Sequence, residues 1–377
     1  MQRRYQHILG IMSGTSLDAV DFALCKFQGM KPGIELLSSW QASFPSPLRK
    51  SLWKAAGGEA TSWETAQLHH DLGRFYARHA QVPEGSPRPD AAGLHGQTIF
   101  HNPARNSPAT FQIGEPSYLA AKLQAPVISN FRAGDLAVGG QGAPLASMFH
   151  LNVFAQPGKH VAVQNLGGIG NLTSIDARRS GSPSILAFDT GPANMLIDRA
   201  CREWTQGRLS FDRDGAWASR GRVNEPLLRT WLRHRFFART PPKSTGREEF
   251  GDVFFSKAQA DVWRRHMSDA DGLATLTALT AASIANSCTA FLPSLPSRLV
   301  LCGGGARNLT LRRMLREQFE RRSQSLEIIT GDDLGWPVSS IEPAAFALLA
   351  WLKLQGRPGN LPETTGASCA VQLGSVT

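Results

Sequence analysis

The sequence predicts an α/β protein of two domains, and three observations lead to this prediction. The chain has 377 residues, which is more than one hydrophobic core usually organises. Apolar, strand-like segments flank a turn of small residues twice, once near residue 14 and again near residue 167. Alternating strand and helix patterns follow each of these units. The repetition favours two duplicated α/β halves over a protein of short repeats.

The first half opens with a hairpin pattern. Segments 7–16 and 19–27 predict two strands around a Gly/Ser/Thr turn, with apolar residues alternating toward one side of the second. Residues 61–80 carry apolar residues at helical spacing. The stretch 91–103 predicts a buried strand that runs into a polar loop. Residues 117–131 predict a helix and then a short strand after a proline.

The second half repeats the opening plan. Residues 160–176 predict a strand, a Gly-rich turn and a second strand, and 184–204 predict a strand, a loop and a helix. A long apolar-periodic helix is expected over 273–292. Residues 297–315 predict a strand that passes through a Gly-rich loop into a helix, and 341–354 predict a final helix.

Composition narrows the classes of protein. No apolar run is long enough to span a membrane, and the basic N-terminus is a poor signal peptide. The five cysteines are scattered and form no CxxC pair, which argues against a disulfide framework or zinc site and favours a reducing cytoplasm. The net charge of +10 is spread along the chain, so a solvated surface explains it better than nucleic-acid binding.

Residues 13–18 form the first Gly-containing turn. Small residues at such a turn let backbone N–H groups approach phosphate oxygens, and its hydroxyls add donors. The order GxxxxGK[ST] is absent, so this is not a P-loop, and an ordinary hairpin turn is the alternative. Asp18 and Asp21 could lie near Mg²⁺, which prefers oxygen ligands, or could equally be turn acids.

Two further Gly-rich loops follow apolar strands, at 165–171 and 303–308. The second holds three consecutive glycines where a strand passes into a helix, so a phosphate or flat ligand could lie against the backbone there. One such loop is weak evidence. Three loops of this kind are hard to explain by packing alone and indicate a ligand-binding site.

Asp189 is the candidate general base. It ends an apolar strand, where ligands bind in open α/β sheets, and Gly191-Pro192 fix a tight turn beside it. The alternative role for a lone Asp is an N-cap, but that role falls more naturally to Asn194 or Thr190. We therefore expect the Asp189 carboxylate to accept a proton in the reaction.

The stretches 130–135 and 139–144 are polar and Gly-rich, and they look like a crossing between domains. Arg132 could bind a carboxylate or phosphate through its guanidinium fork, or form a structural salt bridge. No HxxxH or HExxH pattern occurs, so no histidine metal site is expected.

In order along nearly the whole chain, these segments resemble the successive motifs of the anhydro-N-acetylmuramic acid kinase family. The motifs that carry the resemblance include GIMSGTSLDAVDFAL, LHGQT, NFRAGDLAVGGQGAPL, NLGGIGNLT, AFDTGPANMLID, PPKSTGREEFG, LCGGGARN and IEPAAFALLA. PPKSTGRE and GGQGAPL are specific to that family rather than to kinases at large. The family usually has Asp at the position of Asn130, and Gly at those of Ala19 and Ala193.

The resemblance implies two actin-like (ribonuclease H-like) α/β domains around a central ATP cleft. One would comprise 1–132 with about 345–377, and the other 133–344. The implied enzyme is a cytoplasmic phosphotransferase that uses ATP and Mg²⁺. It would hydrolyse the 1,6-anhydro ring of 1,6-anhydro-N-acetylmuramic acid and phosphorylate O6, giving N-acetylmuramic acid 6-phosphate and ADP in cell-wall recycling. Its partner would be a small sugar, without nucleic acid or membrane, and a homodimer is left open.

The resemblance also implies roles for individual residues. Asp189 would be the catalytic base, and Gln97, Arg132, Gly191 and Glu342 would line the sugar site. No residue is singled out as a metal ligand. The nucleotide would be held by residues of the three Gly-containing loops: Gly14, Thr15, Ser16, Leu17, Asp18, Ala19, Val20, Asp21, Gly167, Gly168, Gly303, Gly304, Gly305 and Asn308.

Two other functions are alternatives. The first is another sugar kinase of the same fold, in which Asp189 deprotonates a hydroxyl group rather than water. The second is a non-catalytic, chaperone-like actin-fold ATPase, which would normally carry a substantial extra partner-binding domain. A nucleic-acid protein is suggested only by the net charge of +10.

Overall fold

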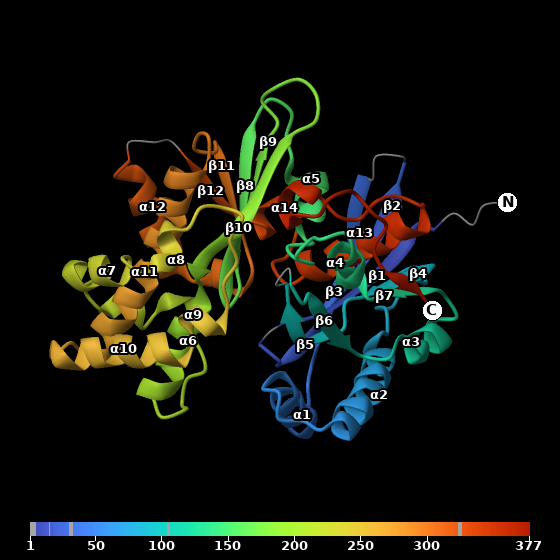
Figure 1. Ribbon diagram of the computed structural model, residues 1–377, viewed down its shortest axis with the longest axis horizontal. Coiled ribbons are helices and arrows are strands. Elements are labelled where there is room, and N and C mark those ends of the chain that lie inside the picture. Colours follow the sequence, from blue (N-terminus) through green and yellow to red (C-terminus); the bar gives the residue numbers. More distant parts are fainter. Residues whose placement is uncertain (1–4, 15, 30–32, 104–105, 323–325) are drawn as a thin grey trace. The chain divides into compact units, whose positions relative to one another are not determined.

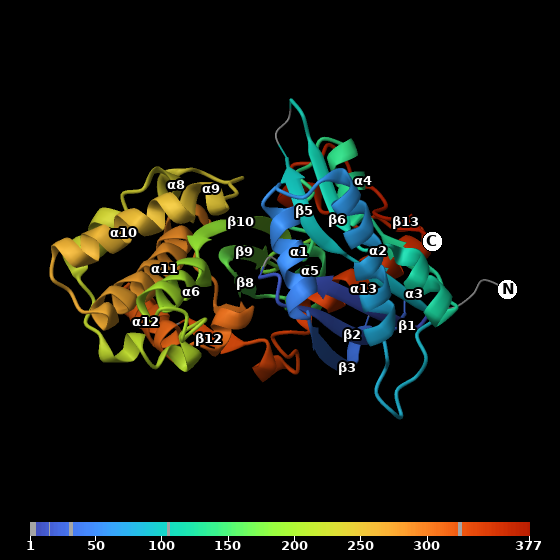
Figure 2. The same cartoon turned by 90° about the horizontal axis from the view of Figure 1, so that it is seen from below.

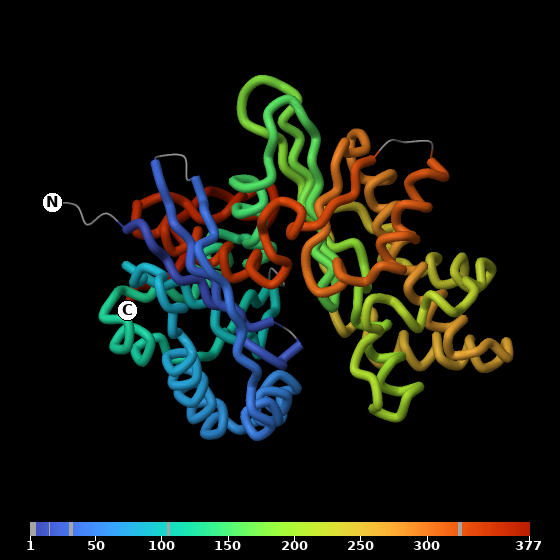
Figure 3. The backbone as a smooth tube through the Cα atoms, turned by 180° about the vertical axis from the view of Figure 1, so that it is seen from behind, coloured from blue at the N-terminus to red at the C-terminus, as the bar shows by residue number. Residues whose placement is uncertain are grey.

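The computed structural model describes residues 5–14, 16–29, 33–103, 106–322 and 326–377, which divide into two compact units (Figure 1). Unit 1 comprises Met1–Val153 and Ser339–Thr377, and unit 2 comprises Phe154–Val338. The expected first boundary, after residue 132, falls inside unit 1. Unit 1 also receives the C-terminal segment, which lies with the N-terminal strands in the tube view (Figure 3).

Unit 1 is built on a six-stranded sheet in the order β13-β7-β4-β1-β2-β3. β1 pairs antiparallel with β2, and β2 antiparallel with β3, whereas β4 and β7 run parallel to β1. The strands are β1 His7–Ser13, β2 Ala19–Gln28, β3 Gly33–Ser43, β4 Ala91–Leu94, β7 Val127–Ser129 and β13 Ser375–Val376. The predicted hairpin is confirmed, and β3 is a strand that the sequence analysis did not predict.

The polar loop predicted after β4 is wrong. Residues Gln97–Asn102 form β5, which pairs antiparallel with β6, Ala109–Ile113, in a separate two-stranded sheet. β5 has one buried residue, Gln97, and its other residues are partly buried or exposed. The partner of β5 is β6, which lies later in the chain, and a strand paired in this way need not show a buried alternating pattern. The sequence of β5 therefore resembled that of a loop.

Helices cover both faces of the unit 1 sheet. Leu9, Ile11 and Phe22 point to one face and pack into a core with α1, Ser46–Ala56, and α2, Ser62–His79. α3, Pro116–Leu123, completes this layer (Figure 2). The predicted helix over 61–80 is thus confirmed as α2, and a capping box formed by Thr61 and Glu64 fixes its start.

The opposite face is covered by α13, Ile341–Leu354, which is buried along almost its whole length. The helix lies so close to the sheet that only glycine fits beneath it. A Cβ added at Gly10 of β1 would lie 1.8 Å from the Pro343 carbonyl oxygen, and one at Gly93 of β4 would lie 2.2 Å from that of Phe346. The remaining helices of this unit are α4 Phe131–Ala137, α5 Ser147–Phe154 and α14 Pro362–Thr365.

Unit 2 repeats the plan with a five-stranded sheet in the order β10-β9-β8-β11-β12. β8, β9 and β10 are antiparallel neighbours, while β11 and β12 run parallel to β8. The strands are β8 His160–Leu166, β9 Ile169–Asp176, β10 Ser184–Pro192, β11 Arg298–Cys302 and β12 Glu327–Thr330. This is the order and direction of β3-β2-β1-β4-β7, so the predicted duplication of two α/β halves is confirmed.

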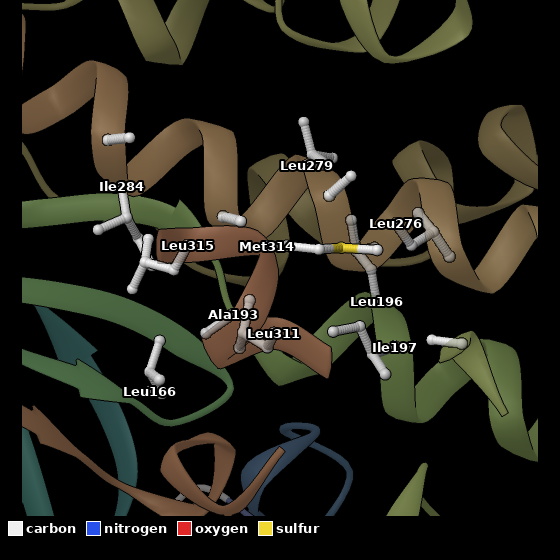
Figure 4. Packing of buried hydrophobic residues seen from close by; sticks show 14 of the residues in the cluster. Leu166, Ala193, Leu196, Ile197, Leu276, Leu279, Ile284, Leu311, Met314 and Leu315 are labelled. Carbon is white, nitrogen blue, oxygen red and sulfur yellow. The ribbon is translucent and has the colours of Figure 1, made fainter. Parts of the chain in front are cut away.

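Three helices pack on this sheet to form the core of unit 2. α6 Asn194–Trp204 contributes Leu196 and Ile197, α11 Asp269–Phe291 contributes Leu276 and Leu279, and α12 Leu309–Glu320 contributes Leu311 and Leu315 (Figure 4). All three were predicted. The other helices of the unit are α7 Glu225–Trp231, α8 Arg235–Ala238, α9 Arg247–Phe250 and α10 Asp252–Arg264, with 3₁₀ turns at Arg213–Gly215, Ala218–Arg220, Gly304–Arg307 and Asp332–Leu334.

All five cysteines have free thiols, and four of them are buried. This agrees with the expectation that the chain carries no disulfide framework. Within the described ranges, no helix combines the length and apolar character needed to cross a membrane.

Candidate active site

The β1–β2 turn is the first nucleotide-site candidate. Gly14 faces open space, because a Cβ added there would meet no atom within 4 Å. Ser13 is buried, and its hydroxyl lies 3.0 Å from the Tyr76 hydroxyl and 3.2 Å from the Gly96 carbonyl oxygen. Leu17 is buried with a φ of 56°, a left-handed conformation. The hydrogen bonds of Ser13 and the burial of Leu17 therefore anchor the turn, while the space beside Gly14 is open. Thr15 lies outside the described residues.

Of the other residues assigned to this turn, Ala19 and Val20 are buried strand residues of β2. Ser16 and Asp18 are exposed, and the Ser16 hydroxyl donates to the Asp18 carboxylate at 2.5 Å. Among the described residues of the turn, Ser16 and Asp18 offer exposed side-chain oxygens to a ligand.

Asp21 lies among other acids. Burial, followed by the nearby charges of Glu342 and Asp18, raises its pKa to about 6, although a hydrogen bond of 2.8 Å from the Gln41 amide opposes the shift. An acidic group held near other carboxylates fits a site that gains a cation when ligand binds. Among the residues that the structure describes, no group of three or more His, Cys, Asp or Glu side chains could hold a metal alone. Mg²⁺ that is bound mainly through nucleotide phosphates would not need one.

Gln97 begins β5 and is buried with 1% exposure. Its amide nitrogen donates to the Gly14 carbonyl at 3.2 Å and to that of Thr98 at 3.3 Å. The side chain expected in the sugar site is thus tied to the backbone of the β1–β2 turn.

Arg132 lies in α4 and is held by two acceptors. Its Nε donates to Nε2 of the buried His95 at 3.0 Å, and Nη1 donates to the Gly142 carbonyl at 2.6 Å. Burial lowers the pKa of Arg132 to about 10, while the charges of Glu342 and Asp135 oppose the shift. Hydrogen bonds to His95 and Gly142, rather than a structural salt bridge, thus hold the Arg132 side chain. The carboxylate of Glu342 lies close enough to act on its charge.

Asp135 holds this region together. It is fully buried and accepts hydrogen bonds from the Gly142 amide at 2.7 Å, the Asn360 side chain at 2.8 Å and the Thr365 hydroxyl at 2.8 Å. The Gly-rich stretch 139–144 is therefore fastened to the C-terminal segment of the chain, within unit 1. The preceding Asn130 has a φ of 56°, which Asn tolerates better than most residues.

The Gly-rich segments of unit 2 lie against one another. The carbonyl of Gly167 accepts the amide of Asn194 at 2.9 Å, and that of Gly168 accepts the amides of Ala193 and Met195 at 3.0 and 3.1 Å. The β8–β9 turn thus supplies the acceptors at the start of α6, which has no side-chain cap. The expectation that Asn194 or Thr190 caps a helix is wrong.

The third loop packs onto the second. Gly303 has a φ of 76°, and a Cβ there would lie 2.3 Å from the Asn165 side-chain oxygen. A Cβ at Gly305 would lie 2.7 Å from that of Asn194, whereas one at Gly304 would meet nothing within 4 Å. Asn308, assigned to the nucleotide, caps α12 by accepting the Leu311 amide at 2.9 Å. Gly304 is the open position of this loop.

Asp189 lies on β10, where the pairing with β9 shifts register between Asp189 and Gly191. Such a bulge re-aims a side chain. Its carboxylate accepts the Thr245 amide at 2.8 Å, and its own amide donates to the Lys243 carbonyl at 3.0 Å. Burial, then the charge of Glu248, raises the pKa of Asp189 to about 7, against the opposing effects of the Thr245 amide and the charge of Lys243.

Gly191 is required by geometry. Its φ is 126°, and a Cβ there would lie 2.7 Å from the Phe237 ring. The structure thus gives Gly191 a backbone role beside Asp189. Its contact with sugar stays a prediction.

Four residues of these networks had no role in the sequence analysis: His95 and Asp135, which act through their side chains, and Lys243 and Thr245, which act through their backbone. His95 and Asp135 hold the segment that carries Arg132, and the loop that carries Lys243 and Thr245 holds Asp189. All four lie within the motifs LHGQT, NFRAGD and PPKSTG. Their place in these motifs was the sequence signal that could have indicated a role in the site.

Comparison with known proteins gives a consistent result along the whole chain. A sequence profile described as "Anhydro-N-acetylmuramic acid kinase" matches residues 6–377. Proteins of that name from Picosynechococcus sp. and Microcystis aeruginosa are similar at 40% and 39% identity over 376 and 377 residues. The alignments cover 98% of this chain in both cases, and 98% and 99% of the relatives.

Among solved structures, a ROK family glucokinase from Streptomyces griseus, in complex with glucose and AMPPNP, is 14% identical with a TM-score of 0.40. The match covers 90% of this chain and 97% of that one. The full-length relatives, rather than this distant similarity, carry the comparison.

Proposed function

The chain belongs to the anhydro-N-acetylmuramic acid kinase family and is a kinase, and we propose that it cleaves and phosphorylates its sugar in one coupled reaction. The substrates are ATP and 1,6-anhydro-N-acetylmuramic acid, and the products are N-acetylmuramic acid 6-phosphate and ADP. The proposal places this step in cell-wall recycling and in the cytoplasm, which agrees with five free thiols.

The observation that carries the proposal is the setting of Asp189. Its carboxylate is held by the Thr245 amide at 2.8 Å, and its pKa is raised to about 7. A general base works best when its pKa lies near the working pH, because it is then both ionised and basic enough to take a proton. Neither the strand bulge nor the raised pKa is needed for a structural role.

The chemistry needs one such base. Water attacks C1 of the sugar and gives its proton to Asp189, and the C1–O6 bond breaks. The departing O6 takes the γ-phosphoryl group of ATP, so the bond from that phosphorus to the bridging oxygen breaks and ADP leaves. O6 is captured by phosphorus instead of being protonated, so a second carboxylic acid is not required.

The nucleotide is assigned to the open glycines of both units. Gly14 in the β1–β2 turn and Gly304 in the β11–α12 loop each leave room for a ligand above the backbone. When bound, Mg²⁺ would neutralise phosphate charge, and Asp18 and Asp21 are the carboxylates nearest to that turn in sequence. Gln97, Arg132 and Glu342 are assigned to the sugar.

Product mass tests the proposed reaction. We expect incubation of the protein with ATP and 1,6-anhydro-N-acetylmuramic acid to give a product heavier than the sugar by one water and one phosphoryl group. The same panel should include N-acetylmuramic acid and other hexoses, for which only phosphoryl addition is possible. A product of the anhydro sugar that gains a phosphoryl group without water would instead identify a simple sugar kinase, with Asp189 deprotonating a hydroxyl group.

A further inference from the structure

Lys243 has an unusual environment inside unit 2. It lies in the loop between α8 and α9, and only 7% of the residue is exposed. Its Nζ lies 4.3 Å from the ring centroid of Phe291, 4.7 Å from that of Phe236 and 5.8 Å from that of Phe188. The faces of aromatic rings attract cations, so these three rings form a box that suits an ammonium group.

The ammonium group is not otherwise satisfied. Within the described parts of the chain, the Lys243 Nζ is buried and has no hydrogen-bond partner. Burying a charge without hydrogen bonds is costly, and ring faces compensate only part of that cost. A methionine side chain would fill the same box without the cost. Packing alone therefore does not explain why a charge stands at this position.

Backbone atoms of the same loop also form hydrogen bonds with Asp189. The Lys243 carbonyl accepts the Asp189 amide at 3.0 Å, and two residues later the Thr245 amide donates to the Asp189 carboxylate at 2.8 Å. Phe188, one wall of the box, directly precedes Asp189 on β10. The ammonium group and the carboxylate are thus joined through one loop and one strand, in surroundings of low polarity where charges act strongly.

The other charges near this pair are accounted for. Arg239 donates a hydrogen bond to Glu249, whose carboxylate also lies 3.5 Å from the side chains of both His234 and Arg235. The exposed Glu248 acts on Asp189 with the opposite sign to Lys243. Arg239 opposes the protonated form of Lys243, whereas Asp189 favours it. His234, Arg235 and Arg239 each lie within ion-pair distance of Glu249, whereas the Lys243 Nζ has no hydrogen-bond partner among the described residues.

We propose that Lys243 is a positioning residue for Asp189, whose buried ammonium stabilises the carboxylate form while its loop fixes the carboxylate in place. The inference deepens the proposed function, because it assigns to Asp189 the role of base. It separates two tasks of the PPKST segment: the backbone sets the geometry, and the Lys243 charge sets the protonation state.

The first test needs no altered loop. Aspartate carboxyls are labelled with ¹³C, and the Asp189 signal is assigned by its loss in Asp189→Asn. We expect the wild-type Asp189 signal to titrate well above the ordinary range of an aspartate and to follow two coupled steps rather than one, because Lys243 loses its proton in an overlapping range. A single inflection, with no response near the titration of Lys243, would overturn the inference.

Two variants should shift the titration midpoint of Asp189 in opposite directions. Lys243→Met removes the favourable charge at nearly constant volume, so the Asp189 midpoint should rise by about one pH unit. Glu248→Gln removes an unfavourable charge and should lower the midpoint, by less because Glu248 is exposed. A folded Lys243→Met protein with an unchanged midpoint would reduce Lys243 to a packing role, even if its melting temperature fell. If that variant does not fold, the wild-type second inflection decides.

The pH profile of kcat then separates the inference from the proposed function. If the acidic limb moves with the carboxyl midpoint in both variants, Lys243 acts on the catalytic base. If the midpoint moves and the limb does not, Asp189 is not the base, and the proposed function fails while the action of Lys243 on Asp189 stands.

Discussion

The balance of effects on Asp189 sets an expectation for pH dependence. Burial and Glu248 raise the pKa of its carboxyl to about 7, well above the ordinary value of 3.8. A base must be ionised, so activity should be fully present above this pKa and lost as the pH falls through it. We expect kcat to decrease about tenfold per pH unit below the limb. A profile that stays flat down to pH about 5 would show that the rate does not depend on this carboxyl.

Asp189→Asn keeps the shape of the side chain and removes the base. We expect kcat to fall by about 10²- to 10⁴-fold, with ring opening and phosphorylation lost together because the two steps are coupled. ATP binding, measured by calorimetry, should persist, since the glycine loops are untouched. Asp214→Asn is the matched control: Asp214 is exposed, with a φ of 56° that Asn also tolerates. Near-normal turnover in Asp189→Asn would remove Asp189 from the mechanism.

At the scale of the element, the close packing of α13 on the unit 1 sheet is the feature most sensitive to small changes. The whole of unit 2 separates this helix in sequence from β1 and β4, the strands on which it packs. It also carries Glu342, one of the residues assigned to the sugar, in its first turn. The glycines beneath it therefore support both the stability of unit 1 and the position of a site residue.

We expect Gly10→Ala to destabilise the protein by about 1–3 kcal/mol or more, because the new methyl group would overlap the backbone of Pro343, which cannot rotate away. The measurement is the midpoint of thermal unfolding. Gly33→Ala is the control, since the nearest atom to a Cβ there is 3.9 Å away at the start of β3. Equal midpoints for the two variants would contradict the close approach of helix and sheet.

At the scale of the whole molecule, the residues assigned to the reaction are shared between the duplicated units. Unit 1 holds the β1–β2 turn, Arg132 and Glu342, and unit 2 holds Asp189 and the Gly303–Gly305 loop. Each unit folds around its own core. The proposal therefore predicts that neither unit has kinase activity alone.

The assigned phosphate loops also predict a need for metal. Segments 13–21 and 165–171 contain no Lys or Arg, 13–21 carries two acids, and 303–308 contains one Arg, so these loops hold too little positive charge to neutralise the triphosphate. We expect excess EDTA to abolish activity and added Mg²⁺ to restore it. Calorimetry should show weaker ATP binding in EDTA. Full activity in the chelator would exclude the metal from the reaction.

The sequence by itself determined the parts of this protein that depend on neighbouring residues. The period of apolar residues predicted the β1–β2 and β8–β9 hairpins and the helices α2, α11 and α13. Gly clusters after apolar strands marked the turns that the two sheets repeat. The ordered motifs indicated the family, which the full-length relatives then showed. These signals are local because they reflect backbone conformation and the alternation of faces.

Only the tertiary structure decided which groups meet across long stretches of chain. Asp135 takes partners at Asn360 and Thr365, and Asn308 proves to be a helix cap as well as a loop residue. The strand β5 depends on a partner that local patterning does not reveal. Lys243 reads as a surface lysine in a polar loop, yet it is buried among three rings. Burial and charge partners set the pKa of Asp189, and both depend on contacts that no local pattern encodes.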